Sequence, residues 1–310
     1  MGYFDLHCDT ILTCLDNKST FRNNGLHIDL DKVSVKPYVQ CGAVFVYDSL
    51  RGEAAYNHFL KAYNYMKELS VKDKFTFILS KEDLISVTEN KSIGIIPTIE
   101  GGAAVAGSLE KLDKVIDMGV KMMTLTWNGS NEIGSGIGDA AADFGLTEFG
   151  KKAVKRMGER NMIVDISHAS EKLFWDVCEY SDKPMVASHS NAKALCGHRR
   201  NLTDEQFAEI VRRGGLVGLN FYKAFLSDVE EKACIETIFE HADYLLSKGG
   251  ENVLAMGSDF DGSDIPADLR GIAGVEDILN VFVKHNYSSE LIEKIFYKNA
   301  YEFTLRHYCL

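Results

Sequence analysis

The residues best suited to chemistry lie at the ends of short apolar runs. The first run, Tyr3–Cys8, leads into His7-Cys8-Asp9. In a β-strand, residues two apart point to the same side, so His7 and Asp9 can reach one metal ion while Cys8 turns away. Imidazole nitrogens and carboxylate oxygens are both ligands of zinc. This spacing predicts part of a metal site.

Four further candidates follow the same rule, because each comes at the end of another strand-like run. They are Glu100 after Ile93–Ile99, His168 after Met162–Ser167, His189 after Pro184–Ser188, and Asp259 after Val253–Ser258. Each of these residues taken alone could be a hydrogen-bonded core residue or part of a turn. Together they match the way in which a barrel enzyme builds a metal site from the ends of separate strands.

A pair of metal ions needs ligands for each ion and a carboxylate that bridges ions about 3.5–4 Å apart. The residues that meet this demand are His7, Asp9, Glu100, His168 and His189. Two Zn²⁺ bring four positive charges, which a bridging hydroxide and the carboxylates of Asp9, Glu100 and Asp259 can balance. Zinc lowers the pKa of bound water to about 7. The sequence therefore predicts a hydrolytic centre with two Zn²⁺ per chain.

The elements that must position these residues alternate between strands and helices. The strand-like runs are Tyr3–Cys8, Val39–Tyr47, Ile93–Ile99, Lys121–Trp127, Met162–Ser167, Pro184–Ser188, Gly215–Phe221 and Val253–Ser258. Helical spacing of apolar residues occurs in Glu53–Leu69, Leu109–Met118, Thr147–Gly158, Glu171–Tyr180, Thr203–Arg212 and Glu230–Lys248. Thr203 and Ser170 are expected to cap helix N-termini, and Gly249-Gly250 is expected to end a helix.

Eight strands in β/α order predict an α/β fold, a (β/α)₈ TIM-type barrel with the metal site at the C-terminal ends of the strands. A doubly wound open sheet is the alternative. The chain has 310 residues, 45% of them hydrophobic, and shows no composition break, repeat or linker. We therefore expect residues 1–310 to form one domain, with a C-terminal helix at about 288–307 packed outside the barrel.

Composition limits the partners and the location. A formal net charge of −11 argues against nucleic acid and anionic membranes as partners. No run of about 18 apolar residues is present, which argues against a transmembrane helix. The seven cysteines include no C-x-x-C pair, which indicates reduced thiols. Because a candidate ligand occurs as early as residue 7, no signal peptide is expected, and the protein is predicted to be cytoplasmic.

Two short motifs have competing interpretations. Gly134–Gly138 is rich in glycine but lacks the G-x-G-x-x-G spacing and does not open a helix, so a loop over the barrel mouth is favoured over dinucleotide binding. Asp259–Gly262 lacks the remaining ligands of a calcium loop and is better interpreted as a strand end followed by a turn.

Several ordered motifs, spread over almost the whole chain, resemble those of the renal or membrane dipeptidases and their bacterial homologues. The motifs are His7-Cys8-Asp9-Thr10, Ile99-Glu100-Gly101-Gly102, Asp165-Ile166-Ser167-His168, Ser188-His189-Ser190, Arg199-Arg200-Asn201 and Gly257-Ser258-Asp259-Phe260-Asp261-Gly262. The resemblance implies a zinc dipeptidase whose ligands are His7 and Asp9 for one ion, His168 and His189 for the other, and Glu100 as the bridge.

The resemblance also implies roles around the substrate. Asp259 would handle the proton and Arg200 would bind the free carboxylate of a dipeptide, which suits the fork of a guanidinium group. Many family members have His after Leu-Thr on the fourth strand, whereas this chain has Trp127. A Trp N–H can donate a hydrogen bond but cannot take up a charge, so polarisation of the carbonyl would rest more on zinc. Trp127 and the Gly134–Gly138 loop are expected to line the substrate pocket.

The predicted function is zinc-dependent hydrolysis of free dipeptides, including those with a C-terminal D-residue, the latter only by resemblance. The alternatives are a related amide or lactone hydrolase with two metals and a non-catalytic metal-binding barrel. Asp259, which is not needed as a ligand, favours catalysis. The amidohydrolases that begin with H-x-H are disfavoured because this chain contains no such motif. The leader and lipid anchor of secreted members are absent, so no membrane partner is expected, and a homodimer is expected only because dimers are common.

Overall fold

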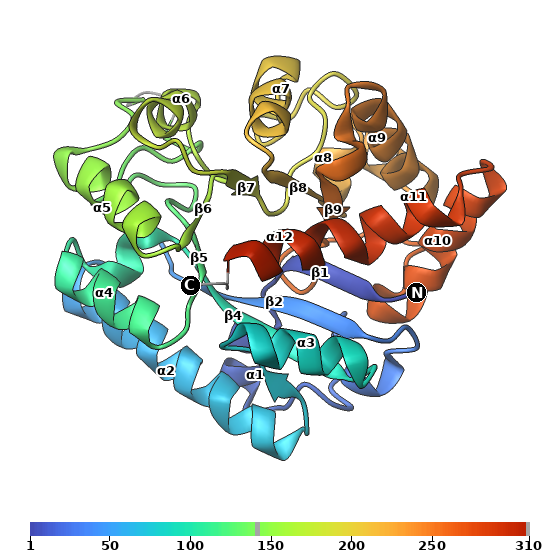
Figure 1. Ribbon diagram of the computed structural model, residues 1–310, viewed down its shortest axis with the longest axis horizontal. Coiled ribbons are helices and arrows are strands. Elements are labelled where there is room, and N and C mark those ends of the chain that lie inside the picture. Colours follow the sequence, from blue (N-terminus) through green and yellow to red (C-terminus); the bar gives the residue numbers. More distant parts are fainter. Residues whose placement is uncertain (140–142, 308–310) are drawn as a thin grey trace.

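The computed structural model describes residues 1–139 and 143–307 as a ring of parallel strands surrounded by helices (Figure 1). In this part of the chain the strands are β1 (Tyr3–Cys8), β2 (Tyr38–Phe45), β3 (Thr76–Phe77), β4 (Ile93–Glu100), β5 (Met122–Thr124), β6 (Ile163–Asp165), β7 (Met185–Ala187), β8 (Leu216–Leu219) and β9 (Leu254–Met256). Their order is β2-β1-β9-β8-β7-β6-β5-β4-β3, and β2 also pairs with β4. That pairing closes a barrel of eight strands. It confirms the predicted (β/α)₈ fold and excludes the alternative, a doubly wound open sheet.

β3 is the strand that the sequence did not predict. It pairs with the first half of β4, through Thr76 to Gly94 and Phe77 to Ile95, while β5 pairs with the last two residues of β4. β3 therefore lies beside the ring and does not form part of it. A strand of two residues is too short to produce a periodic pattern in the sequence.

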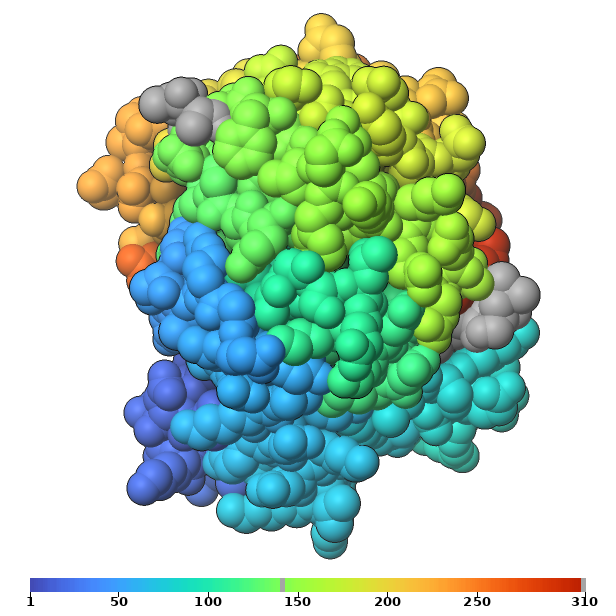
Figure 2. All heavy atoms as spheres, turned by 90° about the vertical axis from the view of Figure 1, so that its left-hand side faces the viewer, coloured from blue at the N-terminus to red at the C-terminus, as the bar shows by residue number. Residues whose placement is uncertain are grey.

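The helices of the described residues are α1 (Thr10–Asn17), α2 (Gly52–Lys72), α3 (Lys81–Glu89), α4 (Leu109–Asp117), α5 (Glu148–Glu159), α6 (Glu171–Tyr180), α7 (Asp204–Arg212), α8 (Lys223–Leu226), α9 (Ile235–Ser247), α10 (Val275–Lys284), α11 (Ser289–Glu293) and α12 (Asn299–His307). The side chains of Thr203 and Ser170 cap α7 and α6 as predicted, and Gly249 follows the end of α9 with a φ of 93°. α1, α3, α8 and α10 were not predicted. No described helix is long and apolar enough to cross a membrane. Figure 2 shows α4, α5 and α6 following one another around the outer face.

Two layers of apolar side chains hold the barrel together. The larger layer fills the space between the strands and the surrounding helices. A smaller cluster fills the barrel interior and includes Phe4, Val39 and Ile96. Tyr297, from the helical turn Lys294–Lys298, and Phe303, from α12, join this inner cluster. The C-terminal helix thus lies outside the strands but crosses the ring at their N-terminal ends, which leaves the C-terminal ends for chemistry (Figure 1).

Candidate metal centre and substrate pocket

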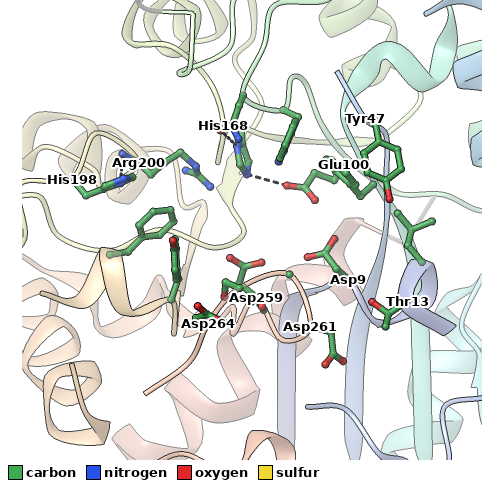
Figure 3. Close-up of a pocket in the computed structure, with 18 of the residues that line it drawn as sticks. Asp9, Thr13, Tyr47, Glu100, His168, His198, Arg200, Asp259, Asp261 and Asp264 are labelled. Carbon is green, nitrogen blue, oxygen red and sulfur yellow. Dashed lines mark hydrogen bonds and ion pairs between the residues drawn. The ribbon is translucent and has the colours of Figure 1, made fainter. Parts of the chain in front are cut away.

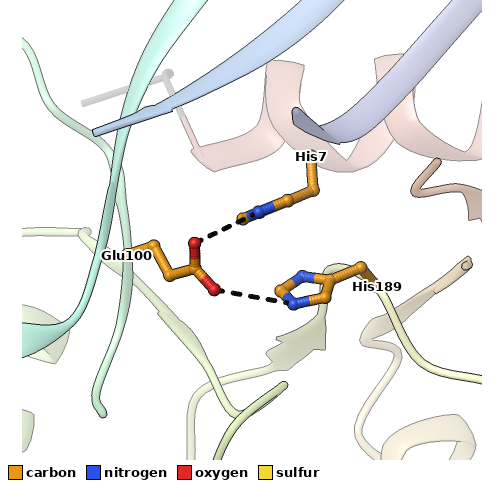
Figure 4. Close-up of side chains that lie close together, drawn as sticks. All are labelled: His7, Glu100 and His189. Atoms are coloured by element: carbon orange, nitrogen blue, oxygen red, sulfur yellow. Dashed lines mark ion pairs between the residues drawn. The ribbon is translucent and has the colours of Figure 1, made fainter. Parts of the chain in front are cut away.

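The carboxylate of Glu100, the last residue of β4, lies among three histidines. Its Oε1 is 2.9 Å from His168 Nε2 and 3.7 Å from His189 Nε2. Its Oε2 is 3.4 Å from Nε2 of His7, which precedes the end of β1. Figure 4 shows Glu100 between His7 and His189. One carboxylate that reaches different imidazoles with its two oxygens has the geometry of a bridging ligand.

The other predicted site residues complete two groups of donors. His7 Nε2 lies 3.4 Å from Asp9 Oδ2, and His168 Nε2 lies 3.0 Å from His189 Nε2. The ligand atoms of His7, Asp9 and Asp259 lie within 4.8 Å of one another. Asp259 adopts a left-handed φ of 60° in the turn after β9. The structure therefore brings together all six residues that the strand-end rule selected.

The electrostatics of this cluster fit metal cations. Burial opposes a charge on His7, but the carboxylates of Glu100 and Asp9 outweigh it and raise the pKa of His7 well above its usual value. Burial lowers the pKa of His168 to about 4 and that of His189 well below its usual range, so both imidazoles are neutral, as a metal ligand must be. Within the described chain, His7 Nε2 and Asp9 Oδ1 are buried without a hydrogen-bond partner. Burial would raise the pKa of Glu100, but His7 and His168 outweigh it and hold that pKa well below its usual value. The cluster thus offers the neutral nitrogens of His168 and His189 beside an anionic carboxylate, a donor set that suits a metal cation.

Hydrogen bonds hold His189 with one nitrogen free. The Ser188 hydroxyl donates to Asp165 Oδ2 at 2.6 Å and lies 2.8 Å from His189 Nδ1. Because the hydroxyl hydrogen points to Asp165, the hydroxyl oxygen accepts a hydrogen bond from Nδ1–H, and Nε2 keeps its lone pair toward Glu100. Asp165 also accepts from Thr124 Oγ1 at 2.6 Å and is 1% exposed. Partners of this kind orient the ligands of metal sites.

His168 is held by Asn128 and by the glycine-rich segment. Its Nδ1 lies 3.2 Å from Asn128 Oδ1, which can only accept, so Nδ1 carries the proton and Nε2 stays free. The backbone N–H of Ile137 donates to the His168 carbonyl at 3.0 Å, and that of Gly138 to the Asn128 carbonyl at 2.7 Å. A Cβ on Gly136 would lie 2.4 Å from the Asn128 carbonyl oxygen. Glycine is therefore required for this close approach.

A cavity of about 740 Å³ opens above the ligand cluster (Figure 3). Trp127, Arg200 and Asp259 line it. The expectation that Gly134–Gly138 lines this cavity is wrong. Gly136 and Ile137 line a smaller neighbouring cavity instead, and the backbone N–H of Ile137 binds the His168 carbonyl. Gly262 lies beneath the carboxylates, where a Cβ would come within 2.0 Å of Asp9 Oδ2.

Arg200 is the buried cation of the cavity. It is 5% exposed, and its three guanidinium nitrogens have no hydrogen-bond partner among the described residues. The Phe225 ring packs against the guanidinium at 5.3 Å. Burial lowers the pKa of Arg200 to about 10, so it stays charged at neutral pH. Figure 3 shows it across the cavity from Glu100 and Tyr47.

Several residues of the site escaped the sequence analysis. Asn220, directly after β8, donates from Nδ2 to Asp259 Oδ2 at 3.1 Å. The same strand-end rule would have found Asn220 had amides been included. Asp5, inside β1, accepts from the backbone N–H groups of His7 and Ser258 at 3.1 and 2.9 Å. The remaining cavity residues include Phe45, Tyr47, His198, Tyr222 and Phe225.

A model of the membrane dipeptidase family, peptidase family M19, matches residues 1–304. The chain belongs to this family. A Klebsiella pneumoniae protein described only as uncharacterized, in the pqqA 5′ region, is 36% identical over 229 residues, which cover 71% of this chain and 84% of that protein. An uncharacterized dipeptidase of Schizosaccharomyces pombe is 30% identical over 226 residues, 70% of this chain, and this match spans 54% of the yeast protein.

Solved structures agree with this membership. The crystal structure of dipeptidase AC, a metallo peptidase of family M19, superposes with a TM-score of 0.93 at 28% identity, covering 100% of this chain and 99% of that one. A metallo peptidase from Rhodobacter sphaeroides, liganded with a phosphinate mimic of the dipeptide L-Ala-D-Ala, gives a TM-score of 0.91 at 26% identity over 99% of both chains. The protein is thus a metallo dipeptidase, a hydrolase of peptide bonds whose family implies metal ions, and the donor cluster fits such ions.

Proposed function

We propose that this protein hydrolyses free dipeptides with the help of two zinc ions. The proposed ligands are His7 and Asp9 for one zinc, His168 and His189 for the other, and Glu100 for both. Zinc bound there would polarise the scissile carbonyl and lower the pKa of a water molecule to about 7. The buried donor cluster, with its unpartnered His7 nitrogen and Asp9 oxygen, supports this assignment.

The unpaired guanidinium of Arg200 is the observation that carries the proposal for dipeptides. A buried charge without a partner is unfavourable, and a carboxylate can satisfy a guanidinium with two parallel hydrogen bonds. A free dipeptide places its terminal carboxylate one residue beyond the scissile bond. A longer peptide places it farther away and puts an amide at Arg200 in its place. Arg200 therefore selects dipeptides by binding their C-terminus.

Asp259 is proposed as the general acid and base. Burial raises its pKa, and the nearby carboxylate of Glu100 adds to this, although His7 and the hydrogen bond from Asn220 oppose it. A raised pKa brings a carboxyl group closer to the pH at which it can both accept and return a proton. Asp259 would take a proton from the attacking water and deliver it to the leaving amine. Asn220 holds the carboxylate in place for this transfer.

Two finer features are proposed as well. The Rhodobacter sphaeroides relative was crystallised with a mimic of L-Ala-D-Ala, which supports acceptance of a C-terminal D-residue here. The six cysteines of the described residues are free thiols, which supports a reducing location such as the cytoplasm.

The direct test compares L-Ala-L-Ala, L-Ala-D-Ala and L-Ala-L-Ala-L-Ala as substrates of the protein loaded with zinc. Both dipeptides should be cleaved and the tripeptide should not, because Arg200 binds a terminal carboxylate that lies one residue beyond the scissile bond. Elemental analysis of the same preparation should give two zinc ions per chain. Tripeptide cleavage at the rate of the dipeptides would contradict the role of Arg200, and one ion per saturated chain would contradict the two-metal site.

A further inference from the structure

The cavity has two different ends, on either side of the metal ligands. Arg200 and His198 lie at one end, and Tyr47 lies at the other, with Glu100 and Asp259 between them (Figure 3). At the Tyr47 end, the Phe45 ring packs edge-on against two neighbours, with ring centroids 4.8 Å from Tyr47 and 4.6 Å from Trp127. All three rings line the cavity. We refer to Phe45, Tyr47 and Trp127 as the aromatic corner.

The fold places the aromatic corner beside the reacting bond. Phe45 is the last residue of β2 and pairs in register with Glu100 on β4. The Trp127 ring centroid lies 6.4 Å from that of His168. The aromatic corner therefore begins directly next to two of the proposed metal ligands.

The aromatic corner is also held in place and partly uncovered. His58 Nε2 forms a hydrogen bond with the Phe45 carbonyl at 3.0 Å, and the His58 ring packs on Tyr47 with centroids 5.6 Å apart. Tyr47 is nevertheless 43% exposed. A supported set of rings that leaves apolar surface open to a cavity provides a binding surface for an apolar group.

We propose that the aromatic corner binds the side chain of the N-terminal residue and makes the enzyme prefer dipeptides that begin with a large apolar residue. This inference rests on the proposed function, because Arg200 sets the direction of the substrate. With the terminal carboxylate at Arg200 and the scissile carbonyl at the metal ligands, the N-terminal residue extends toward Tyr47. A cavity of about 740 Å³ has room for a large side chain there.

The Arg200 end of the cavity suits the C-terminal residue of the substrate. There the Tyr222 and His198 rings pack on Phe225, with centroids 4.9 and 4.5 Å away, and Phe225 in turn packs against the Arg200 guanidinium. These rings support the arginine and border the place of the C-terminal residue. A change at Tyr222 should therefore affect the C-terminal side chain and serve as a matched control for the aromatic corner.

The test uses two pairs of peptides, Leu-Gly with Ala-Gly and Gly-Leu with Gly-Ala, on the zinc-loaded protein. The kcat/KM of Leu-Gly should exceed that of Ala-Gly roughly tenfold or more, since one methylene in an apolar pocket is worth roughly 10–200-fold. Tyr47→Ala and Trp127→Ala should bring this ratio toward one and leave the Gly-Leu to Gly-Ala ratio unchanged. Tyr222→Ala should leave the Leu-Gly to Ala-Gly ratio unchanged. The exposure of Tyr47 makes Tyr47→Ala compatible with folding.

Four outcomes would overturn the inference. A parent enzyme that cleaves these dipeptides without preferring Leu-Gly would remove it and leave the proposed function intact. The Leu-Gly to Ala-Gly ratio could stay unchanged in both Tyr47→Ala and Trp127→Ala, or it could fall together with the Gly-Leu to Gly-Ala ratio by the same factor. Either result would show that the aromatic corner does not bind the N-terminal side chain. If the zinc-loaded parent cleaved none of the four peptides, the proposed function would fail and the inference with it.

Discussion

Replacing Arg200 by Met should weaken catalysis on dipeptides and stabilise the free protein at the same time. Hydrogen bonds to a charged group contribute roughly 1.5–3 kcal/mol, and about 1.4 kcal/mol corresponds to a factor of ten. Arg200→Met should therefore lower kcat/KM on L-Ala-L-Ala by roughly one to two decades. The dipeptide amide L-Ala-L-Ala-NH₂ lacks the carboxylate and should show almost no further loss.

The stability change follows from the same buried charge. Burial lowers the pKa of Arg200 from 12.5 to about 10, so the charged form is disfavoured in the folded state. At about 1.4 kcal/mol per unit, this amounts to an order-of-magnitude penalty of about 3 kcal/mol at neutral pH. Methionine keeps much of the volume without the charge, so the free energy of unfolding without substrate should rise by up to about that amount.

The assay combines steady-state kinetics on the dipeptide and its amide with denaturant unfolding, and exposed Arg199→Met serves as the neighbouring control. Arg199→Met should change neither measurement appreciably. Equal losses of kcat/KM on dipeptide and amide, or a large loss of stability in Arg200→Met, would show that Arg200 supports the fold and does not bind the substrate carboxylate.

Three other substitutions test separate parts of the site. Asp259→Asn should lower kcat by roughly 10²–10⁴-fold with zinc content unchanged, and an unchanged kcat in zinc-replete protein would refute proton transfer by Asp259. Asn128→Ala frees His168 Nδ1 and should weaken the binding of one of the two zinc ions by roughly 10–100-fold, measured by chelator competition, whereas equal weakening of both ions would contradict a local effect. Buried His241 accepts from the Ala192 N–H at 3.2 Å, and burial lowers its pKa to about 4. Between pH 6.5, the approximate pKa of an unfolded histidine, and pH 4, the His241 ring takes up a proton mainly in the unfolded chain. The free energy of unfolding should therefore decrease by up to about 3 kcal/mol as the pH is lowered through this range. His241→Gln should flatten that part of the unfolding curve, and an unaltered slope would refute the assignment.

The barrel could be predicted because buried parallel strands appear in the sequence as short apolar runs. The candidate ligands could be brought together on paper because each lies at or just after the end of such a run, and parallel strands bring their C-terminal ends to one edge. α1 was missed because its apolar residues continue the pattern of β1 after Asp9 without a break. Its N-cap residue, Asp9, makes no side-chain cap hydrogen bond, and Leu12 stands where a capping box has Glu or Gln, so the start signal in the sequence was incomplete.

The supporting residues were harder to predict, because their partners lie on other strands. Asp165 resembles any polar strand residue until the register places Ser188 and Thr124 beside it. Composition likewise could not reveal that Gly136 packs against a carbonyl of the preceding loop. Sequence spacing identifies which side chains share a face, whereas these contacts depend on the distance between two segments of backbone.

The charges of the site would allow this acidic protein to bind the anionic C-terminus of the proposed substrate. The chain carries a formal net charge of −11, which repels a carboxylate at long range. Asp259 and Glu100 favour the charged form of Arg200, while burial opposes it. Metal cations at the ligand cluster would neutralise those carboxylates and leave Arg200 as the uncompensated charge next to them. The terminal carboxylate of a dipeptide would then be the partner of the Arg200 guanidinium, so metal binding should strengthen substrate binding through Arg200.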